Sequence, residues 1–131
     1  MLVVDASALV AYLTSGEHAE QVRAHLLAPY EALWAPHLVD AEVGHVLRRG
    51  VLAGELRAGA ARAALDDLAD LPLRRASHRR LLVRAWALRE NVSFYDGLYV
   101  ALAERLRATL LTLDGRLAGA PGVRASVVHV G

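Results

Sequence analysis

The sequence contains no cysteine and no lysine. The absence of cysteine excludes thiol nucleophiles, disulfide bonds, cysteine-ligated zinc and iron–sulfur clusters. The absence of lysine excludes Schiff-base catalysis, a P-loop lysine and a lysine general base, and it makes all fifteen basic residues arginine. Whatever chemistry the protein performs must therefore come from carboxylates, histidine, hydroxyl groups and arginine.

Long apolar runs and an excess of one charge are absent as well. No stretch reaches the roughly 20 consecutive apolar residues that cross a bilayer. The N-terminal segment lacks the basic residues of a signal peptide, and Asp5 interrupts its apolar run. We therefore expect a soluble, cytoplasmic protein with no membrane partner. The net charge of +1 means that any polyanion must be bound by a local basic patch.

The composition predicts a single domain over residues 1–131, because 55% of the residues are hydrophobic and only 22% are charged. Apolar runs predict strands at 2–4, 33–35, 73–76, 109–113 and 126–130. Helical patterns lie between them at about 8–13, 17–28, 37–49, 55–70, 78–90 and 93–106, with a short helix from 115. This alternation, without a hairpin signal, predicts a three-layer α/β/α domain with a mainly parallel central sheet.

Local signals predict some boundaries and some packing. We expect Ser7 to cap the first helix and Gly50 to end the third. We expect these aromatic side chains to pack in the core: Trp34, Trp86, Tyr95 and Tyr99. For Trp34, stacking on a nucleic-acid base is the alternative.

Four carboxylates lie where a parallel sheet would bring them to one edge. Asp5 and Asp114 directly follow predicted strands. Glu42 and Asp96 lie in the first turns of predicted helices. Because ligands bind outside the carboxyl ends of the strands in such sheets, we expect the four side chains to converge there.

Each of these acids also has a purely structural interpretation. Asp5 and Asp114 could cap the helices that follow them, and Glu42 could be a solvated helix residue. Ser93 and Asp96 fit the capping box, which accounts for Asp96 without any function. Only the coincidence of all four on one predicted edge favours a functional site.

A cluster of four carboxylates requires a counter-charge. Two carboxylates about 4 Å apart repel each other by roughly 4 kcal/mol at an effective dielectric of 20. No arginine directly flanks Asp5 or Asp96, and a site made only of oxygens suits Mg²⁺ or Mn²⁺ better than zinc. Mg²⁺ usually keeps water ligands and binds few carboxylates together with phosphate oxygens, which fits hydrolysis of a phosphodiester.

The four acids are embedded in segments that resemble a known family. These segments read MLVVDASALVAYL, PHLVDAEVGHVLRRG, NVSFYDGLYVALAERL and TLLTLDGRLA. In this order they resemble the motifs of PIN-domain ribonucleases, and most closely those of VapC-type toxins of bacterial type II toxin–antitoxin modules. The resemblance covers essentially the whole chain. Each motif alone is weak, and the ordered set is specific.

The resemblance implies a Mg²⁺- or Mn²⁺-dependent endoribonuclease. Asp5, Glu42, Asp96 and Asp114 match the acidic catalytic positions, and all but Glu42 are expected to hold the metal. Members of this family are usually inhibited by an antitoxin encoded beside them, and they usually dimerise. We therefore expect RNA, a cognate antitoxin and a second copy of the chain as partners.

The resemblance also assigns supporting roles and shows one departure from the family. Ser7 and Thr112 match small polar positions that support the acidic cluster. Many members carry a further acid shortly after the last aspartate, whereas Gly115, Arg116 and Leu117 follow it here. No fifth carboxylate is therefore expected.

Three arginines are candidates for RNA binding, because their forked guanidinium groups suit phosphate: Arg79, Arg80 and Arg84. Such arginines can equally form a solvated face. Asp40 lies about 200° from Glu42 on a helix, so we interpret it as a partner of the helix dipole rather than a ligand. His45 forms a single E-x-x-H motif with Glu42, whereas di-iron bundles need two.

Other functions remain open. The chain could be a PIN-fold ribonuclease of RNA processing without an antitoxin, or a PIN fold that binds RNA or protein without catalysis. A receiver domain also collects acids around Mg²⁺, but it normally has paired acids after its first strand and a lysine near its end, and this chain has neither. A D-x-D phosphatase is disfavoured because Ala6 and Ser7 follow Asp5.

Overall fold

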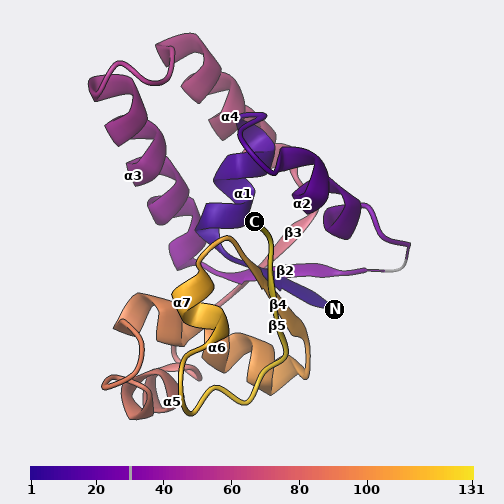
Figure 1. Cartoon of the computed structure of the whole chain (residues 1–131), viewed down its shortest axis with the longest axis vertical. Helices are drawn as coiled ribbons and strands as arrows, with labels where there is room; N and C mark the ends of the chain where they lie inside the picture. The colour runs from indigo at the N-terminus through magenta and orange to yellow at the C-terminus, as the bar shows by residue number, and fades with distance from the viewer. Residues whose placement is uncertain (30) are drawn as a thin grey trace.

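The computed structural model describes residues 1–29 and 31–131, and these form a five-stranded sheet covered by helices on both faces (Figure 1). The strands are β1 (Leu2–Val4), β2 (Leu33–Pro36), β3 (Leu73–Ala76), β4 (Thr109–Thr112) and β5 (Val127–His129). All four strand pairings are parallel, in the order β3-β2-β1-β4-β5. The expected three-layer fold is confirmed, and its described sheet is wholly rather than mainly parallel.

The strands are apolar because helices cover both faces of the sheet. The three residues of β1 are all buried, and Val3 lies in register with Trp34 on one side and Leu110 on the other. The sheet reverses its direction of growth between β1 and β4, since β2 and β3 extend it one way and β4 and β5 the other. This reversal creates a switch point, where ligands bind in folds of this kind.

The helices divide into two layers. One layer contains α1 (Ala6–Leu13), α2 (Ala19–Leu26), α3 (Leu38–Leu52) and α4 (Ala58–Asp70). The other contains α5 (Leu82–Ala87), α6 (Phe94–Leu106) and α7 (Gly115–Ala118). In Figure 1 the magenta pair α3 and α4 and the orange pair α5 and α6 lie on opposite sides of the strands. Helix α6 packs on β1, β2 and β4, so it covers one face of the sheet across the switch point.

The order and type of the predicted elements are confirmed, and several details are wrong. Asp5, not Ser7, caps α1, because its carboxylate accepts a hydrogen bond from the Ala8 amide. Helix α3 continues past Gly50 to Leu52, and the left-handed turn falls at Gly54, where φ is +76°. Helix α5 is shorter than the predicted helix over 78–90 because turns flank it.

The aromatic residues divide between core and surface. Tyr99 is buried as expected, but Trp86 and Tyr95 are 60% and 59% exposed. They belong to α5 and the first turn of α6, whose outer faces are not covered within the described chain. Within residues 1–29 and 31–131, none of the helices combines the length and apolar character needed to cross a membrane.

A close approach of α5 and α6 holds the second layer together. A Cβ atom built on Gly97 would lie 3.1 Å from both the Cα and the carbonyl oxygen of Ala85. Backbone atoms cannot rotate away as a flexible side chain can. A residue with a side chain at position 97 would therefore require the backbone of α5 to shift by a few tenths of an ångström.

We expect Gly97→Ala to destabilise the fold by about 1–3 kcal/mol, because the added methyl group forces α5 away from α6. Gly44→Ala in α3 is the matched control, since a methyl group added there meets no neighbouring atom within 4 Å. This control should be neutral or stabilise by up to about 1 kcal/mol. Urea unfolding of both variants measures the difference, and equal unfolding free energies would contradict the packing argument.

Candidate active site

The carboxylate of Asp5 is buried at the end of β1 and is 6% exposed. One of its oxygens, Oδ1, accepts hydrogen bonds from the Ser7 hydroxyl at 2.6 Å and from the Ala8 amide at 3.0 Å. The other, Oδ2, accepts one from the Thr112 hydroxyl. Burial raises the pKa of Asp5, and these hydrogen bonds oppose the rise. The side chain is thus held in a single orientation at the switch point.

The two hydroxyl groups also fix the loop after β4. The Leu113 amide donates to Ser7 Oγ at 3.0 Å, and the Asp114 amide donates to Thr112 Oγ1 at 2.9 Å. Each hydroxyl therefore donates to Asp5 and accepts from the segment that carries Asp114. Ser7 and Thr112 thereby connect the first and the last of the four predicted acids.

Glu42 is positioned from the opposite layer by a tyrosine. The Tyr99 hydroxyl of α6 donates to Glu42 Oε1 at 2.7 Å, and this bond joins α6 to α3 at the edge of the sheet. Burial raises the pKa of Glu42, the Tyr99 bond opposes the rise, and the charges of Asp96 and Asp5 add to it. Burial and the neighbouring carboxylates likewise raise the pKa of Tyr99, so its hydroxyl stays protonated as a donor.

Asp96 and Asp114 line a small cleft of about 180 Å³ together with Ser93, Arg116 and Leu117. Asp96 lies in the first turn of α6, where its amide donates to the Ser93 hydroxyl at 3.0 Å. Burial raises the pKa of Asp96, and the charge of Asp114 raises it further. The capping expected of Ser93 is present, and the Asp96 side chain is nevertheless part of the cleft.

Asp114 differs from the other three acids in accepting hydrogen bonds from a positively charged side chain. Burial opposes its ionisation, but hydrogen bonds from the Arg116 guanidinium and amide lower its pKa below the ordinary value. The guanidinium Nε lies 3.3 Å from Asp114 Oδ1. No further acid was expected shortly after Asp114. Arg116, two residues after Asp114, is instead a cation that pairs with this carboxylate.

The four carboxylates interact electrostatically as one cluster. The negative charge of Asp96 raises the pKa of both Asp5 and Glu42, and that of Asp114 raises the pKa of Asp96. The contacts agree with this, since Asp96 and Asp114 line one cleft and Asp5 is joined through Ser7 and Thr112 to the segment of Asp114. The ionised carboxylates therefore repel one another, and a bound cation would reduce this repulsion.

The donor set at this edge fits a hard divalent cation. It consists of carboxylate and hydroxyl oxygens, the ligands that Mg²⁺ and Mn²⁺ prefer. Within the described parts of the chain, no three acidic or histidine side chains are arranged so that one ion could contact all of them. Mg²⁺ commonly binds through one or two carboxylates and completes its shell with water, so pairs among these acids suffice.

The predicted arginines differ in their surroundings. Arg79 and Arg80 are exposed. Arg84 donates from Nε to Glu104 Oε1 at 2.7 Å and from Nη2 to the Gly122 carbonyl at 2.7 Å. Since this guanidinium already has partners in the fold, the structure does not favour the RNA-binding role expected of Arg84.

Two residues of the site escaped the sequence reasoning, namely Tyr99 as the donor to Glu42 and Arg116 as the partner of Asp114. The signal for Arg116 was its spacing of two residues after an acid that caps a short helix. Asp40 is not part of the cluster, because both of its oxygens accept hydrogen bonds from Arg75 at 2.8 Å.

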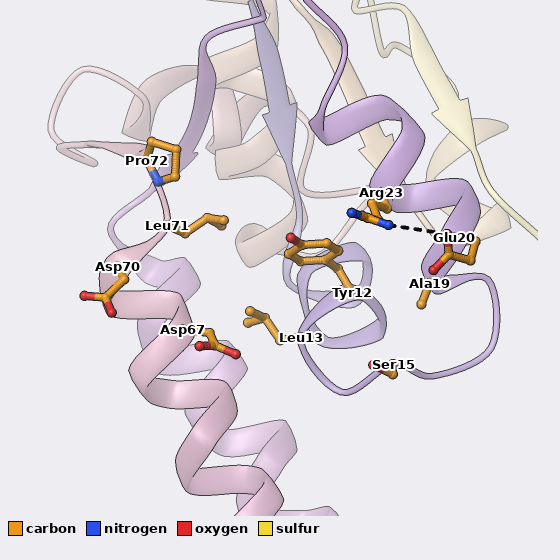
Figure 2. A pocket seen from close by; sticks show the side chains of 10 residues that line it. All are labelled: Tyr12, Leu13, Ser15, Ala19, Glu20, Arg23, Asp67, Asp70, Leu71 and Pro72. Atoms are coloured by element: carbon orange, nitrogen blue, oxygen red, sulfur yellow. Dashed lines mark ion pairs between the residues drawn. The ribbon is translucent and has the colours of Figure 1, made fainter.

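A separate hollow of about 570 Å³ lies between α1, α2 and the end of α4 (Figure 2). Tyr12 faces it from α1, and Asp67 and Asp70 belong to α4. Because α1 and α4 both end here, the hollow lies toward the amino ends of the strands and away from the carboxylate cluster. It contains none of the predicted site residues.

Comparison with known proteins gives consistent relatives. Residues 2–123 match the family model of the PIN domain. The chain is 50% identical over 126 residues to ribonuclease VapC1 of Mycobacterium tuberculosis, which covers 95% of this chain and 94% of that protein. The structure resembles that of PAE2754 from Pyrobaculum aerophilum, with a TM-score of 0.71 and 26% identity. The match covers 96% of this chain and 81% of that one. It also resembles a chain of a toxin–antitoxin complex from Klebsiella pneumoniae, with a TM-score of 0.63 and 22% identity. This match covers 98% of this chain and 96% of that one.

Asp96→Asn should raise the melting temperature of the metal-free protein, because it removes one repelling charge and keeps the amide that donates to Ser93. The pKa of Asp96 is raised in the folded state, so the stability gained by its protonation is present below about pH 4 and is lost as the pH rises. The advantage of the variant should therefore be small near pH 4 and reach roughly 3–6 °C near neutral pH.

Thermal unfolding in the presence of a chelator measures this difference across the pH range. Asp67→Asn is the matched control, since Asp67 is exposed on α4. It should leave the melting temperature nearly unchanged. If Asp96→Asn melts below the wild type at neutral pH, the structural role of Asp96 at the start of α6 outweighs the repulsion.

Proposed function

Because the chain belongs to the PIN-domain family, among the VapC ribonucleases that are the toxins of toxin–antitoxin modules, we propose that its four convergent carboxylates form the active site that hydrolyses RNA phosphodiester bonds. The observation that carries this proposal is the contact network at the switch point of the sheet. Ser7 and Thr112 join Asp5 to the segment that carries Asp114, Tyr99 bonds to Glu42, and Asp96 and Asp114 line one cleft. One sheet includes strands from Leu2 to His129, which supports a single catalytic domain over residues 1–131.

Pairs among Asp5, Asp96 and Asp114 would hold Mg²⁺ or Mn²⁺ with water completing its shell, and Ser7 and Thr112 support them. A bound divalent cation supplies a water of lowered pKa and stabilises negative charge on the phosphate. The hydroxyl groups of Ser7 and Thr112 hold the buried Asp5 carboxylate in one orientation. The coordinating oxygens are thus preorganised by bonds within the chain.

We assign to Glu42 the acceptance of a proton from the attacking water. Its Oε1 is engaged by the Tyr99 hydroxyl, which favours the ionised form. Burial and the nearby acids raise its pKa toward the range in which a carboxylate serves as a general base. Tyr99 acts as a positioning residue, because it touches Glu42 rather than the reacting atoms.

RNA, an antitoxin and a second copy of the chain are the proposed partners. The exposed guanidinium groups of Arg79 and Arg80 suit RNA phosphates. Solved structures with the same fold include a toxin–antitoxin complex, and the acidic cluster would attract a basic segment of a cognate antitoxin. A homodimer finds support in large apolar side chains that are exposed on α5 and at the start of α6, namely Leu82, Val83, Trp86, Phe94 and Tyr95.

Glu42→Gln and Asp96→Asn should each lower the rate of Mg²⁺-dependent RNA cleavage at least about 100-fold, because they remove the proton acceptor and a metal ligand without changing side-chain volume. Asp96→Asn should also reduce the rise in melting temperature that Mn²⁺ gives the wild type by binding only the folded state. Asp67→Asn on α4 is the control with the same chemical change. Undiminished cleavage in both site variants would contradict the assignment.

The cognate antitoxin should inhibit the ribonuclease by placing a basic side chain against the carboxylates. Activity should fall in proportion to the antitoxin bound, and Asp96→Asn should weaken the complex roughly tenfold, because one charge-assisted hydrogen bond is lost. Calorimetric titration and a cleavage assay on the same samples measure both effects. Full activity at saturating antitoxin would overturn this model of inhibition.

A further inference from the structure

A second hollow, of about 710 Å³, lies on the α6 side of the sheet near its edge strand β3. Trp34 of β2, Leu81 after β3 and Leu102 of α6 form an apolar floor. Arg79, Arg80 and Arg105 also line it. We call this hollow the β3 groove.

The arginines of the β3 groove are not used by the fold. Across residues 1–29 and 31–131, no hydrogen bond or ion pair engages the guanidinium groups of Arg79, Arg80 or Arg105. Arg74 lies beside the groove and is engaged differently, since its guanidinium carbon lies over the Trp34 ring, 5.6 Å from the ring centre. This accumulation of positive charge has no acidic counterpart among the residues that line the groove.

Two other arginines of the chain, in contrast, form ion pairs within the fold. Arg75 is bound to Asp40 at 2.8 Å, and Arg84 to Glu104 at 2.7 Å. Both are partly covered, whereas Arg79, Arg80 and Arg105 are exposed. The cations of the β3 groove therefore remain available for an external anion.

Helix α6 contributes residues to both the β3 groove and the carboxylate cluster. Asp96 lies in the first turn of this helix and Arg105 in its last turn, nine residues further on. At 1.5 Å per residue this separation is about 14 Å along the helix axis. Arg79 and Arg80 follow β3 at the carboxyl edge of the sheet, the edge at which the cluster lies.

We infer that the β3 groove binds a stretch of the RNA substrate on one side of the scissile phosphodiester, with Arg79, Arg80 and Arg105 on phosphates and a base against the apolar floor. This inference rests on the proposed ribonuclease function. Separated cations around an apolar floor that contains an indole suit a nucleotide strand, which alternates phosphates with flat bases. An acidic protein would satisfy the arginines but not require the floor.

The test uses the Glu42→Gln protein, so that RNA is bound without being cleaved. In this background, Arg79→Ala/Arg105→Ala should weaken binding of a single-stranded oligoribonucleotide of about 15 nucleotides roughly 10- to 100-fold. The dependence of log Kd on log salt should become shallower by about 1.4, because two phosphate contacts are lost. Fluorescence anisotropy at several salt concentrations measures both quantities.

Arg48→Ala/Arg57→Ala is the matched control, because both residues are exposed arginines, one in α3 and one at the N-cap of α4, in the other helix layer, and the described residues give their guanidinium groups no hydrogen bond or ion pair. It removes the same charge and should change affinity less than threefold. Equal loss in both double variants would show that only net charge matters and would overturn the inference. A changed molecular mass of Arg79→Ala/Arg105→Ala in light scattering, with RNA affinity retained, would instead identify the groove as an interface between copies and would also overturn it.

Trp34 provides a local probe of the same groove. With Trp86→Phe added, Trp34 is the one remaining tryptophan in the sequence, and its emission should change as RNA binds. Arg79→Ala/Arg105→Ala should suppress this change at RNA concentrations that saturate the parent protein. Cleavage by the wild type is measured in parallel, because its absence would contradict the proposed function, whereas cleavage with an unresponsive Trp34 would contradict only the groove.

Discussion

A carboxylate buried between two parallel strands is the constraint on which the rest of this structure depends. Asp5 is 6% exposed, and a buried charge of this kind is tolerated only when its oxygens are hydrogen-bonded. Ser7, Ala8 and Thr112 supply those bonds from α1 and from β4. The hydroxyl groups of Ser7 and Thr112 also accept hydrogen bonds from the amides of the loop after β4. The contacts that stabilise the Asp5 carboxylate therefore also determine where Asp114 lies.

The electrostatics divide the cluster into two parts. Burial raises the pKa of Asp5, Glu42 and Asp96, so these groups are costly to ionise together in the absence of a cation. Asp114 is the exception, because Arg116 lowers its pKa. The proposed metal site would trade stability of the empty protein for affinity toward its ligands. The Tyr99 hydroxyl limits the cost at Glu42 by donating across the sheet edge.

The sequence was sufficient to predict the strands, the layers and the edge at which the acids lie, because apolar periodicity and parallel topology determine these features. It could not predict that Asp5 rather than Ser7 caps α1, since either side chain can bond a helix amide and only tertiary contacts decide between them. Tyr99 and Glu42 are 57 residues apart, so their bond depends on how α6 and α3 are placed. The exposure of Trp86 was likewise unpredictable, because it depends on which helix face the fold leaves uncovered.

The bond from Thr112 to Asp5 spans 107 residues, and β4 is the fourth of the five strands along the chain. Every segment that carries Asp5, Glu42 or Asp96 is therefore synthesised before the strand that completes their arrangement. Domains fold during translation only as far as the emerged chain allows, and long-range parallel pairing is slow. A nascent chain still short of β4 lacks the strand that joins the proposed site residues, so the proposed active site cannot assemble until β4 has been synthesised.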